Sequence, residues 1–206
     1  MSLLIRNASL AGATIFALAA AFALAGCVAG ATKHASTGWT TLIDGKGGER
    51  GWVAWGDANW HRTGGVLTAD HGDGVLLSPS TYANLDLRVE FWTERDTNSG
   101  VFIRCTDPKN VTPTNCYEAN LFDSRPYEEF STGSIVTVAK PPKPMAAGGR
   151  WSRIEIHAEG RHLRVTLNGE LAIDTQVDRV SAGAIGIQYR SGGAVKFRRV
   201  EIRPLP

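Results

Sequence analysis

The sequence has little net charge and lacks the short motifs of several enzyme classes. Its 206 residues carry 22 Lys and Arg against 20 Asp and Glu, a formal net charge of +2 at pH 7. This balance gives no electrostatic argument for a nucleic-acid partner or an anionic membrane surface. The chain also shows no Ser-His-Asp order, no phosphate-binding loop and no dinucleotide fingerprint, so the simplest signals for those chemistries are missing.

Cysteine is scarce, and two of the three cysteines bracket one polar loop. Cys105 and Cys116 enclose about ten residues that include Pro and Asn. In an oxidising compartment such a pair is most simply a disulfide, which would contribute roughly 2–3 kcal/mol by restricting the unfolded chain. A metal site is the rival interpretation, but no His or third Cys lies close in sequence. We therefore predict a Cys105–Cys116 disulfide and no metal at this pair.

Long hydrophobic runs are absent except at the N-terminus. Arg6 is the only charge in the first 26 residues, and an apolar run from Ala8 to Ala25 follows it. A charged start, a short apolar core and small residues at its end are typical of a secretory signal. A retained membrane span is disfavoured, because the run is at or below the ~20 residues needed and no stop-transfer charges follow.

The end of the apolar run is more specific than a general export signal. The residues Leu24-Ala25-Gly26-Cys27 resemble a bacterial lipobox, in which cleavage leaves Cys27 at the new N-terminus to carry lipid. A plain secretory peptide with an incidental Cys27 is the alternative. We predict a signal peptide at 1–26, a tether at 27–38 and one domain at 39–206. The expected location is the bacterial cell envelope, lipid-anchored, on the periplasmic or outer-membrane side.

Helical periodicity is absent after the signal, and alternation of apolar and polar residues replaces it. The clearest case is Leu85 to Thr93, where Leu87, Val89 and Phe91 point one way and their neighbours the other. Asn168-Gly169 is a strong hairpin signal, because both residues tolerate positive φ. Similar short runs occur at 75–77, 101–104, 117–122, 134–138, 151–157, 162–167, 171–175, 184–189 and 195–203. Ten or more short strands indicate an all-β fold, an antiparallel sandwich or jelly roll.

Strand parity predicts which polar side chains leave the core. If the apolar residues of each run point inward, six polar or aromatic residues point outward and could share one face. Arginine, acids, amides and a large aromatic ring with few lysines are typical of a carbohydrate site, since rings stack on sugar C–H surfaces. An ordinary solvated face is the alternative. The six residues are Glu90, Trp92, Arg104, Glu118, Asn120 and Gln188.

Several segments in order resemble the 3-keto-disaccharide hydrolase family, formerly a domain of unknown function. They are LIDGKGGERGW, NSGVFIR, YEANLFD, TGSIV, WSRIEIHAEGRHLRVTLNG and GAIGIQYRSGGAVKFRRVEIRPL. The resemblance runs from about Trp39 to Leu205 and implies a concanavalin-like jelly-roll sandwich of two antiparallel sheets. Members are commonly exported and often lipidated. The cysteine-bracketed loop departs from the family pattern, and so does Asn120, which stands where Gln is usual.

The resemblance implies a carbohydrate substrate and a reaction at a 3-keto sugar. The ketone would acidify the C2–H, a carboxylate would remove that proton, the C1 aglycone would leave, and water would add to the enone. Glu118 or Asp123 is the predicted base and Arg104 the predicted enolate stabiliser. Asn120 and Gln188 would orient hydroxyls, and Glu90 and Trp92 would complete the substrate-binding face. The two-carboxylate glycosidase mechanism could use the same acids.

Other interpretations stay open at this point. A non-catalytic carbohydrate-binding jelly roll is the main alternative, and a structural envelope lipoprotein is a third. No cofactor is predicted, although Asp44 in a turn could help to bind a divalent cation such as Ca²⁺. Asp70, His71 and Asp73 could suggest a metal, but a polar hairpin turn explains them equally well, and we favour the turn. The sequence carries no signal of oligomeric state.

Overall fold

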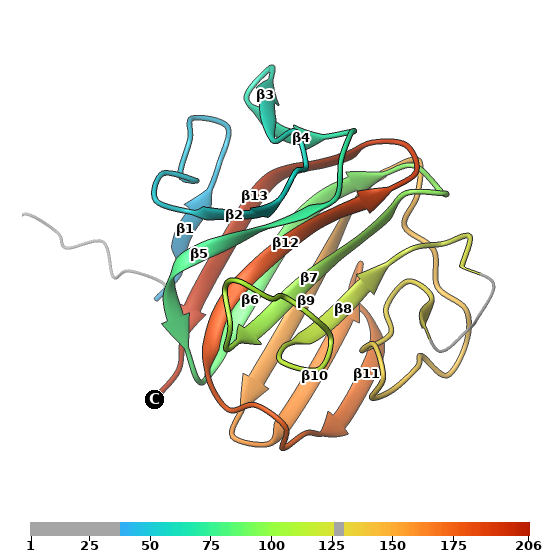
Figure 1. The fold of residues 1–206 in the computed structure, drawn as a ribbon. Coiled ribbons are helices and arrows are strands. Elements are labelled where there is room, and N and C mark those ends of the chain that lie inside the picture. The colour runs from blue at the N-terminus through green and yellow to red at the C-terminus, as the bar shows by residue number, and fades with distance from the viewer. Residues whose placement is uncertain (1–37, 126–129) are drawn as a thin grey trace, which may run out of the picture. The chain divides into compact units, whose positions relative to one another are not determined.

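The computed structural model describes residues 38–125 and 130–206, which form a sandwich of two antiparallel β-sheets (Figure 1). The predicted all-β fold class is confirmed. Within the described ranges no helix is long and apolar enough to cross a membrane. The predicted signal peptide, Cys27 and all but the last residue of the predicted tether lie outside the described residues.

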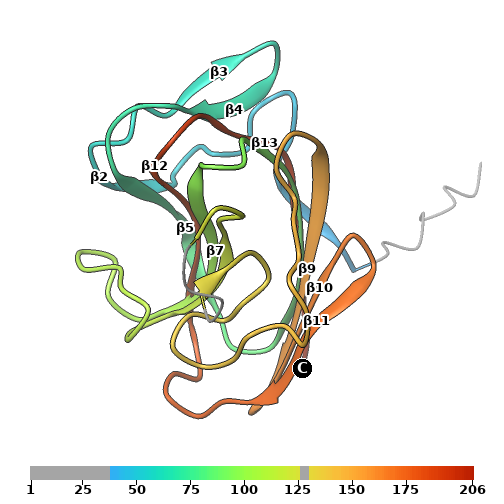
Figure 2. The same ribbon diagram turned by 90° about the vertical axis from the view of Figure 1, so that its right-hand side faces the viewer.

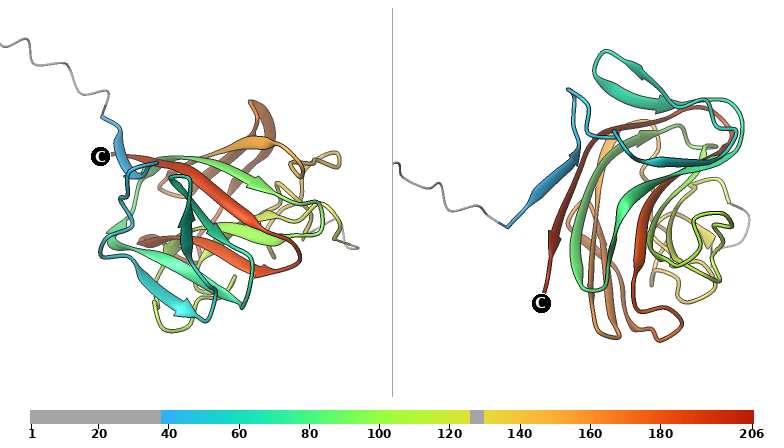
Figure 3. Two further views of the ribbon diagram at one scale, coloured as in Figure 1. Left: turned by 90° about the horizontal axis from the view of Figure 1, so that it is seen from above. Right: turned by 60° about the vertical axis from the view of Figure 1, so that its left-hand side comes forward.

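The larger sheet has eight strands and contains the N-terminal and C-terminal strands side by side. β1 (Thr40–Ile43) pairs with β13 (Val195–Pro204). The order across the sheet is β11 (Glu170–Gln176), β10 (His162–Leu167), β9 (Trp151–Glu159), β6 (Leu85–Thr93), β13, β4 (Val66–Ala69) and β3 (His61–Thr63). The β3–β4 hairpin projects at one end of the sandwich (Figures 1 and 3).

The smaller sheet has five strands and faces the larger one (Figure 2). Its order is β2 (Val53–Gly56), β5 (Gly74–Tyr82), β12 (Gly183–Ser191), β7 (Asn98–Cys105) and β8 (Tyr117–Leu121). Consecutive strands cross between the sheets, since β5 and β7 belong to the smaller sheet and β6 to the larger one.

Alternation along the strands produces the core between the sheets. In β6 every second residue from Leu85 to Thr93 is buried, and Val89 and Phe91 are inaccessible to solvent. Val101, Ile103 and other inward residues of the smaller sheet meet them from the opposite side. The predicted inward parity of these strands is therefore confirmed. The predicted hairpin between β10 and β11 is also present, with Asn168 and Gly169 both at positive φ.

The outer face of the smaller sheet is covered by chain segments, and it is therefore not a simple solvated surface. The predicted Cys105–Cys116 disulfide is present and closes a loop against that face. Phe102 and Val111 belong to a small apolar cluster beneath this loop, and Trp55 Nε1 donates to the Lys109 carbonyl oxygen at 2.7 Å. The loop buries one end of the face.

A segment after β8 borders the same face from the other side. The Asn120 N–H donates to the Ser134 carbonyl at 2.9 Å, and the Val136 N–H donates to the Glu118 carbonyl at 3.0 Å. Residues 130–136 thus continue the sheet beyond β8 without forming a regular strand. As a result β8, which would otherwise be an edge strand, is buried along its whole length.

Candidate active site on the outer face of the smaller sheet

The six residues predicted to share one face divide between the two sheets. Glu118, Asn120 and Gln188 come from β8 and β12 and lie on the outer face of the smaller sheet. Glu90 and Trp92 come from β6 and lie on the outer face of the larger sheet. The prediction of one shared face is therefore wrong, because parity tells inward from outward but does not say to which sheet a strand belongs.

Glu90 and Trp92 are engaged with neighbouring cations on their own sheet. Glu90 accepts hydrogen bonds from Arg153 at 3.2 Å and from Arg198 at 2.7 Å. The Lys196 ammonium lies 4.3 Å from the centre of the Trp92 ring. These contacts are those of a charged, solvated sheet face. They leave neither residue available to the Glu118 site on the other side of the sandwich.

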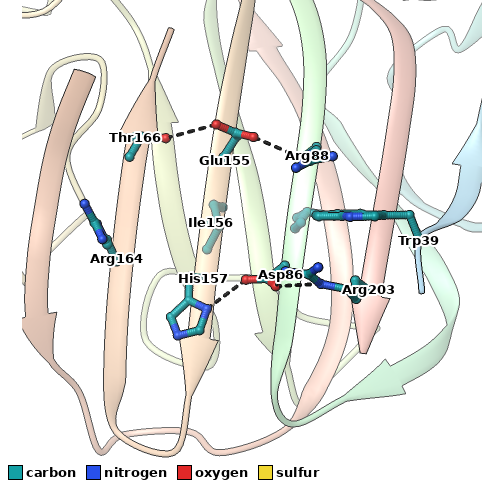
Figure 4. Close-up of a pocket in the computed structure, with 10 residues that line it drawn as sticks. Trp39, Asp86, Arg88, Glu155, Ile156, His157, Arg164, Thr166 and Arg203 are labelled. Carbon is teal, nitrogen blue, oxygen red and sulfur yellow. Dashed lines mark hydrogen bonds and ion pairs between the residues drawn. The ribbon is translucent and has the colours of Figure 1, made fainter. Parts of the chain in front are cut away.

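A pocket of about 210 Å³ lies on the same outer face of the larger sheet (Figure 4). Both of its carboxylates are paired: Asp86 with His157 at 2.7 Å and with Arg203 at 2.6 Å, and Glu155 with Arg88 at 3.0 Å. Opposite charges across neighbouring strands stabilise a sheet surface. Because both carboxylates are already paired with basic side chains, this pocket is a weaker candidate for acid–base chemistry than the Glu118 site.

Arg104 is buried at the end of the sandwich, away from Glu118. Its φ of +55° interrupts the alternation of β7, and its side chain is only 1% exposed. Nε donates to the Ala83 carbonyl at 2.8 Å, in the turn between β5 and β6. Nη1 donates to the Gly160 carbonyl at 3.0 Å, in the turn between β9 and β10. The prediction that Arg104 points outward beside Glu118 is wrong. Its backbone conformation turns the side chain off that face.

Asp123 follows β8 and fastens two loops. Its carboxylate accepts hydrogen bonds from the Thr132 hydroxyl at 2.6 Å, from the Ala147 N–H at 3.0 Å and from the Gly148 N–H at 2.8 Å. Three donors occupy most of the lone pairs of this carboxylate. Of the two carboxylates predicted as candidate bases, Asp123 is therefore the one already committed to holding the chain in place.

Glu118 is a buried acid without a partner. Its side chain is 7% exposed, and within residues 38–125 and 130–206 no donor is hydrogen-bonded to its carboxyl group. Burial raises the pKa of Glu118 from 4.5 to about 7, and the positive charges of Arg190 and Arg125 oppose part of that rise. A carboxyl whose pKa lies near neutrality can both accept and return a proton, which is what acid–base catalysis requires.

Two amides accompany Glu118 on this face. Asn120 is 1% exposed, and its Nδ2 donates to the Phe130 carbonyl oxygen. That bond fixes the orientation of the amide, and within residues 38–125 and 130–206 no donor reaches its buried Oδ1. Gln188 is 7% exposed, and its buried Oε1 likewise receives no hydrogen bond from the part of the chain that the structure describes. Buried polar atoms are nearly always hydrogen-bonded, so two unpaired acceptors beside an unpaired acid mark a functional site.

Three residues that belong to this site were not predicted from the sequence. Gly100 lies between Gln188 and Asn120 in the strand register. Arg125 and Arg190 are the positive charges that act on Glu118, and Arg190 lies 3.8 Å from Asp73. Arg190 could have been found by parity, since it is two residues beyond Gln188 on the same strand. Arg125 follows the strand end, where parity makes no prediction.

The described residues provide no evident metal centre. In that part of the chain no three His, Cys, Asp or Glu side chains come together as they would around an ion. Asp44 Oδ1 accepts the Lys46 N–H at 2.7 Å within a turn. Asp70 Oδ1 accepts a hydrogen bond from Asn59 Nδ2 at 2.8 Å and lies 2.6 Å from His71 Nδ1.

The site geometry can be set beside known families. The family described as the 3-keto-alpha-glucoside-1,2-lyase-like domain matches residues 38–203. The chain belongs to this family. The family resemblance predicted from the ordered motifs is confirmed, and this lyase-like domain spans nearly all of the described residues. No protein of curated function matches the chain in sequence.

Solved structures share the fold of the lyase-like domain. A candidate glycosyl hydrolase from Parabacteroides distasonis has a TM-score of 0.67 at 24% identity, over 81% of this chain and 99% of its own. A galectin-like protein from Bacillus subtilis has a TM-score of 0.61 at 13% identity, over 80% and 94%. A carbohydrate-binding module from Bacillus subtilis has a TM-score of 0.55 at 19% identity, over 80% and 95%. The concanavalin-like jelly roll is thereby confirmed.

Proposed function

We propose that this protein cleaves 3-keto-glycosides by proton abstraction at C2, with Glu118 as the base. The observation that carries the proposal is the Glu118 carboxyl, which is buried, has no ionic or hydrogen-bonded partner among the described residues, and has a pKa of about 7. A structural carboxylate is normally paired, as Asp86 and Asp123 are. An unpaired one is costly to bury and is typical of a site where the cost has a function.

The chemistry follows from the ketone. The C3 carbonyl acidifies the C2–H, and the Glu118 carboxylate takes that proton while the electrons move onto the carbonyl oxygen as an enolate. The enolate then collapses, the C1–O bond breaks, and the leaving oxygen takes a proton from the carboxyl group. Addition of water to the resulting enone completes a net hydrolysis. One acid–base group therefore removes the C2 proton and returns it to the leaving oxygen. The family description as a 1,2-lyase-like domain supports this order of steps.

Positive charge near the enolate would come from Arg125 and Arg190. The positive charges of both oppose the rise of the Glu118 pKa. Their charges would stabilise the enolate as it develops. They replace Arg104, which the fold places elsewhere.

A two-carboxylate glycosidase mechanism is less well supported. It requires a second free acid flanking the scissile bond. Asp123, the other candidate, is held by three donors, and the neighbours of Glu118 on its own face are amides. A single base with an activated substrate fits this set of residues better.

A non-catalytic carbohydrate-binding function is the second candidate. The fold likeness to a carbohydrate-binding module from Bacillus subtilis favours it. A binding module would need the amides but would gain nothing from a buried carboxyl of raised pKa. A carbohydrate is the proposed ligand in both cases.

The decisive assay compares two substrates. The protein, expressed from residue 28, is incubated with a 3-keto-disaccharide and separately with its unoxidised parent, and sugar release is measured. We expect cleavage of the keto form alone, with a primary isotope effect when C2 carries deuterium. Cleavage of neither sugar would rule out the enzyme, and equal cleavage of both would rule out the keto-dependent mechanism.

We also propose export and lipid anchoring through Cys27. The charged start, the apolar run and the lipobox-like residues 24–27 support it, and the Cys105–Cys116 disulfide fits an oxidising compartment. A Cys27→Ser variant is expected to lose incorporation of labelled fatty acid and to move from the membrane fraction to the soluble one. Equal labelling of both forms would contradict the anchor.

A further inference from the structure

A glycine sits at the centre of the candidate site and is not explained by the fold. Gly100 lies in the middle of β7, paired with Gln188 of β12 on one side and Asn120 of β8 on the other. Its φ does not lie in the positive range, so its backbone would accept any residue. Glycine in a strand interior weakens the strand and usually marks a place where something approaches closely.

The space above Gly100 is occupied by the functional groups themselves. A Cβ built on Gly100 would lie 2.8 Å from Glu118 Oε1 and 3.4 Å from Gln188 Oε1. Glu118 and Gln188 therefore both extend over the glycine, and Asn120 flanks it. Any larger residue would push the carboxyl group aside. The missing side chain is what lets an acid and an amide from different strands reach the same point.

The atoms gathered there lack donors. Among the described residues, no donor is hydrogen-bonded to Asn120 Oδ1, to Gln188 Oε1 or to the Glu118 carboxyl group. A ligand that satisfies this site must bring its own donors. Hydroxyl groups on a sugar ring do so, whereas a ligand that carries only acceptors would leave the buried oxygens unpaired at considerable cost.

We propose that Gly100 is a positioning residue of this site: because it carries no side chain, the Glu118 carboxyl and the Gln188 amide converge over it. Hydroxyls of a bound pyranose ring beside the ketone then donate to the amide oxygens of Asn120 and Gln188. The identity of the sugar as a 3-keto-glycoside rests on the proposed function. The requirement for hydroxyl donors and for the absence of a side chain at position 100 rests on the geometry alone.

The test measures binding without turnover. The affinity for a 3-keto-disaccharide is determined by calorimetry in Glu118→Gln protein, which should bind but not react. Adding Gly100→Ala is expected to weaken binding by about 100-fold, because the new methyl group displaces the side chains at 118 and 188 from the positions where they meet the sugar. A keto-sugar analogue lacking the hydroxyl at C4 is expected to bind at least about tenfold more weakly than the full sugar.

A matched control comes from a second strand glycine. A Cβ on Gly186 would also lie 2.8 Å from its nearest atom, but that atom is Val75 Cγ1 in the apolar cluster under the disulfide loop. Gly186→Ala should therefore crowd the protein to a similar extent while keeping affinity within about fivefold. Thermal melting of both variants establishes that they are folded.

The outcomes separate this inference from the proposed reaction. Equal affinity in the Gly100→Ala and Gly186→Ala proteins, or no binding by the Glu118→Gln protein, would overturn the inference. Strong loss at Gly100 with little at Gly186 supports it. If the wild-type protein binds the sugar with this dependence on Gly100 but cleaves nothing, the reaction is wrong and the positioning role of Gly100 stands.

Discussion

Replacing Glu118 with Gln is expected to lower kcat by about 1,000-fold while changing KM little. The amide has nearly the same shape as the carboxyl group but cannot accept the C2 proton. In the wild-type protein kcat/KM should rise with pH through about 7, since the base acts only when it is ionised. The variant should lose that rise. Steady-state rates between pH 5 and 9 on a 3-keto-disaccharide measure both effects.

The control for this experiment is the other predicted carboxylate. Asp123→Asn should keep kcat within about tenfold but lower the free energy of unfolding by about 2 kcal/mol, since one acceptor becomes a donor facing Thr132, Ala147 and Gly148. If Glu118→Gln protein retained turnover and Asp123→Asn protein were inactive, Asp123 and not Glu118 would be the base.

The same Glu118→Gln substitution is expected to stabilise the protein at alkaline pH. The pKa of Glu118 is raised in the folded state, from 4.5 to about 7, so the folded protein favours the protonated acid. Its contribution to stability is complete below pH 4.5 and is lost as pH rises through about 7. A shift of this size corresponds to roughly 3 kcal/mol. Gln carries no charge at any pH and escapes that loss.

Urea unfolding of both proteins at pH 4 and pH 8 measures the effect. The two should have similar free energies of unfolding at pH 4, and the variant should exceed the wild type by about 3 kcal/mol at pH 8. Comparison at each pH cancels the titration of all other groups. An equal difference at both pH values would mean that the Glu118 carboxyl is solvated in the folded protein, and the argument for its raised pKa would fail.

Sequence patterns predicted much of the fold because alternation is a local property. The run from Leu85 to Thr93 alternates as a strand must when one side is buried, and the structure buries Leu87, Val89 and Phe91. Asn168-Gly169 predicted its hairpin because both residues tolerate the turn's backbone conformation. The disulfide was predictable from the spacing of two cysteines and the expectation of an oxidising compartment. Each of these depends on neighbours in sequence.

The site was predicted only in part. The outward placement of Glu118, Asn120 and Gln188 followed from parity, and all three lie on one face. Glu90 and Trp92 also point outward, as parity predicted, yet they occupy the opposite surface of the sandwich. Arg104 failed for a different reason, because one residue at positive φ breaks the alternation on which parity depends.

The sequence by itself determined the fold class, the inward and outward side of most strands, the disulfide and the family. Tertiary structure alone decided which strands share a sheet, which of the two carboxylates has no partner among the described residues, and that Gly100 leaves space for the Glu118 carboxyl. The physical reason is that alternation is set by the geometry of one strand. Strand order, hydrogen-bond partners and burial depend on segments that lie far away along the chain.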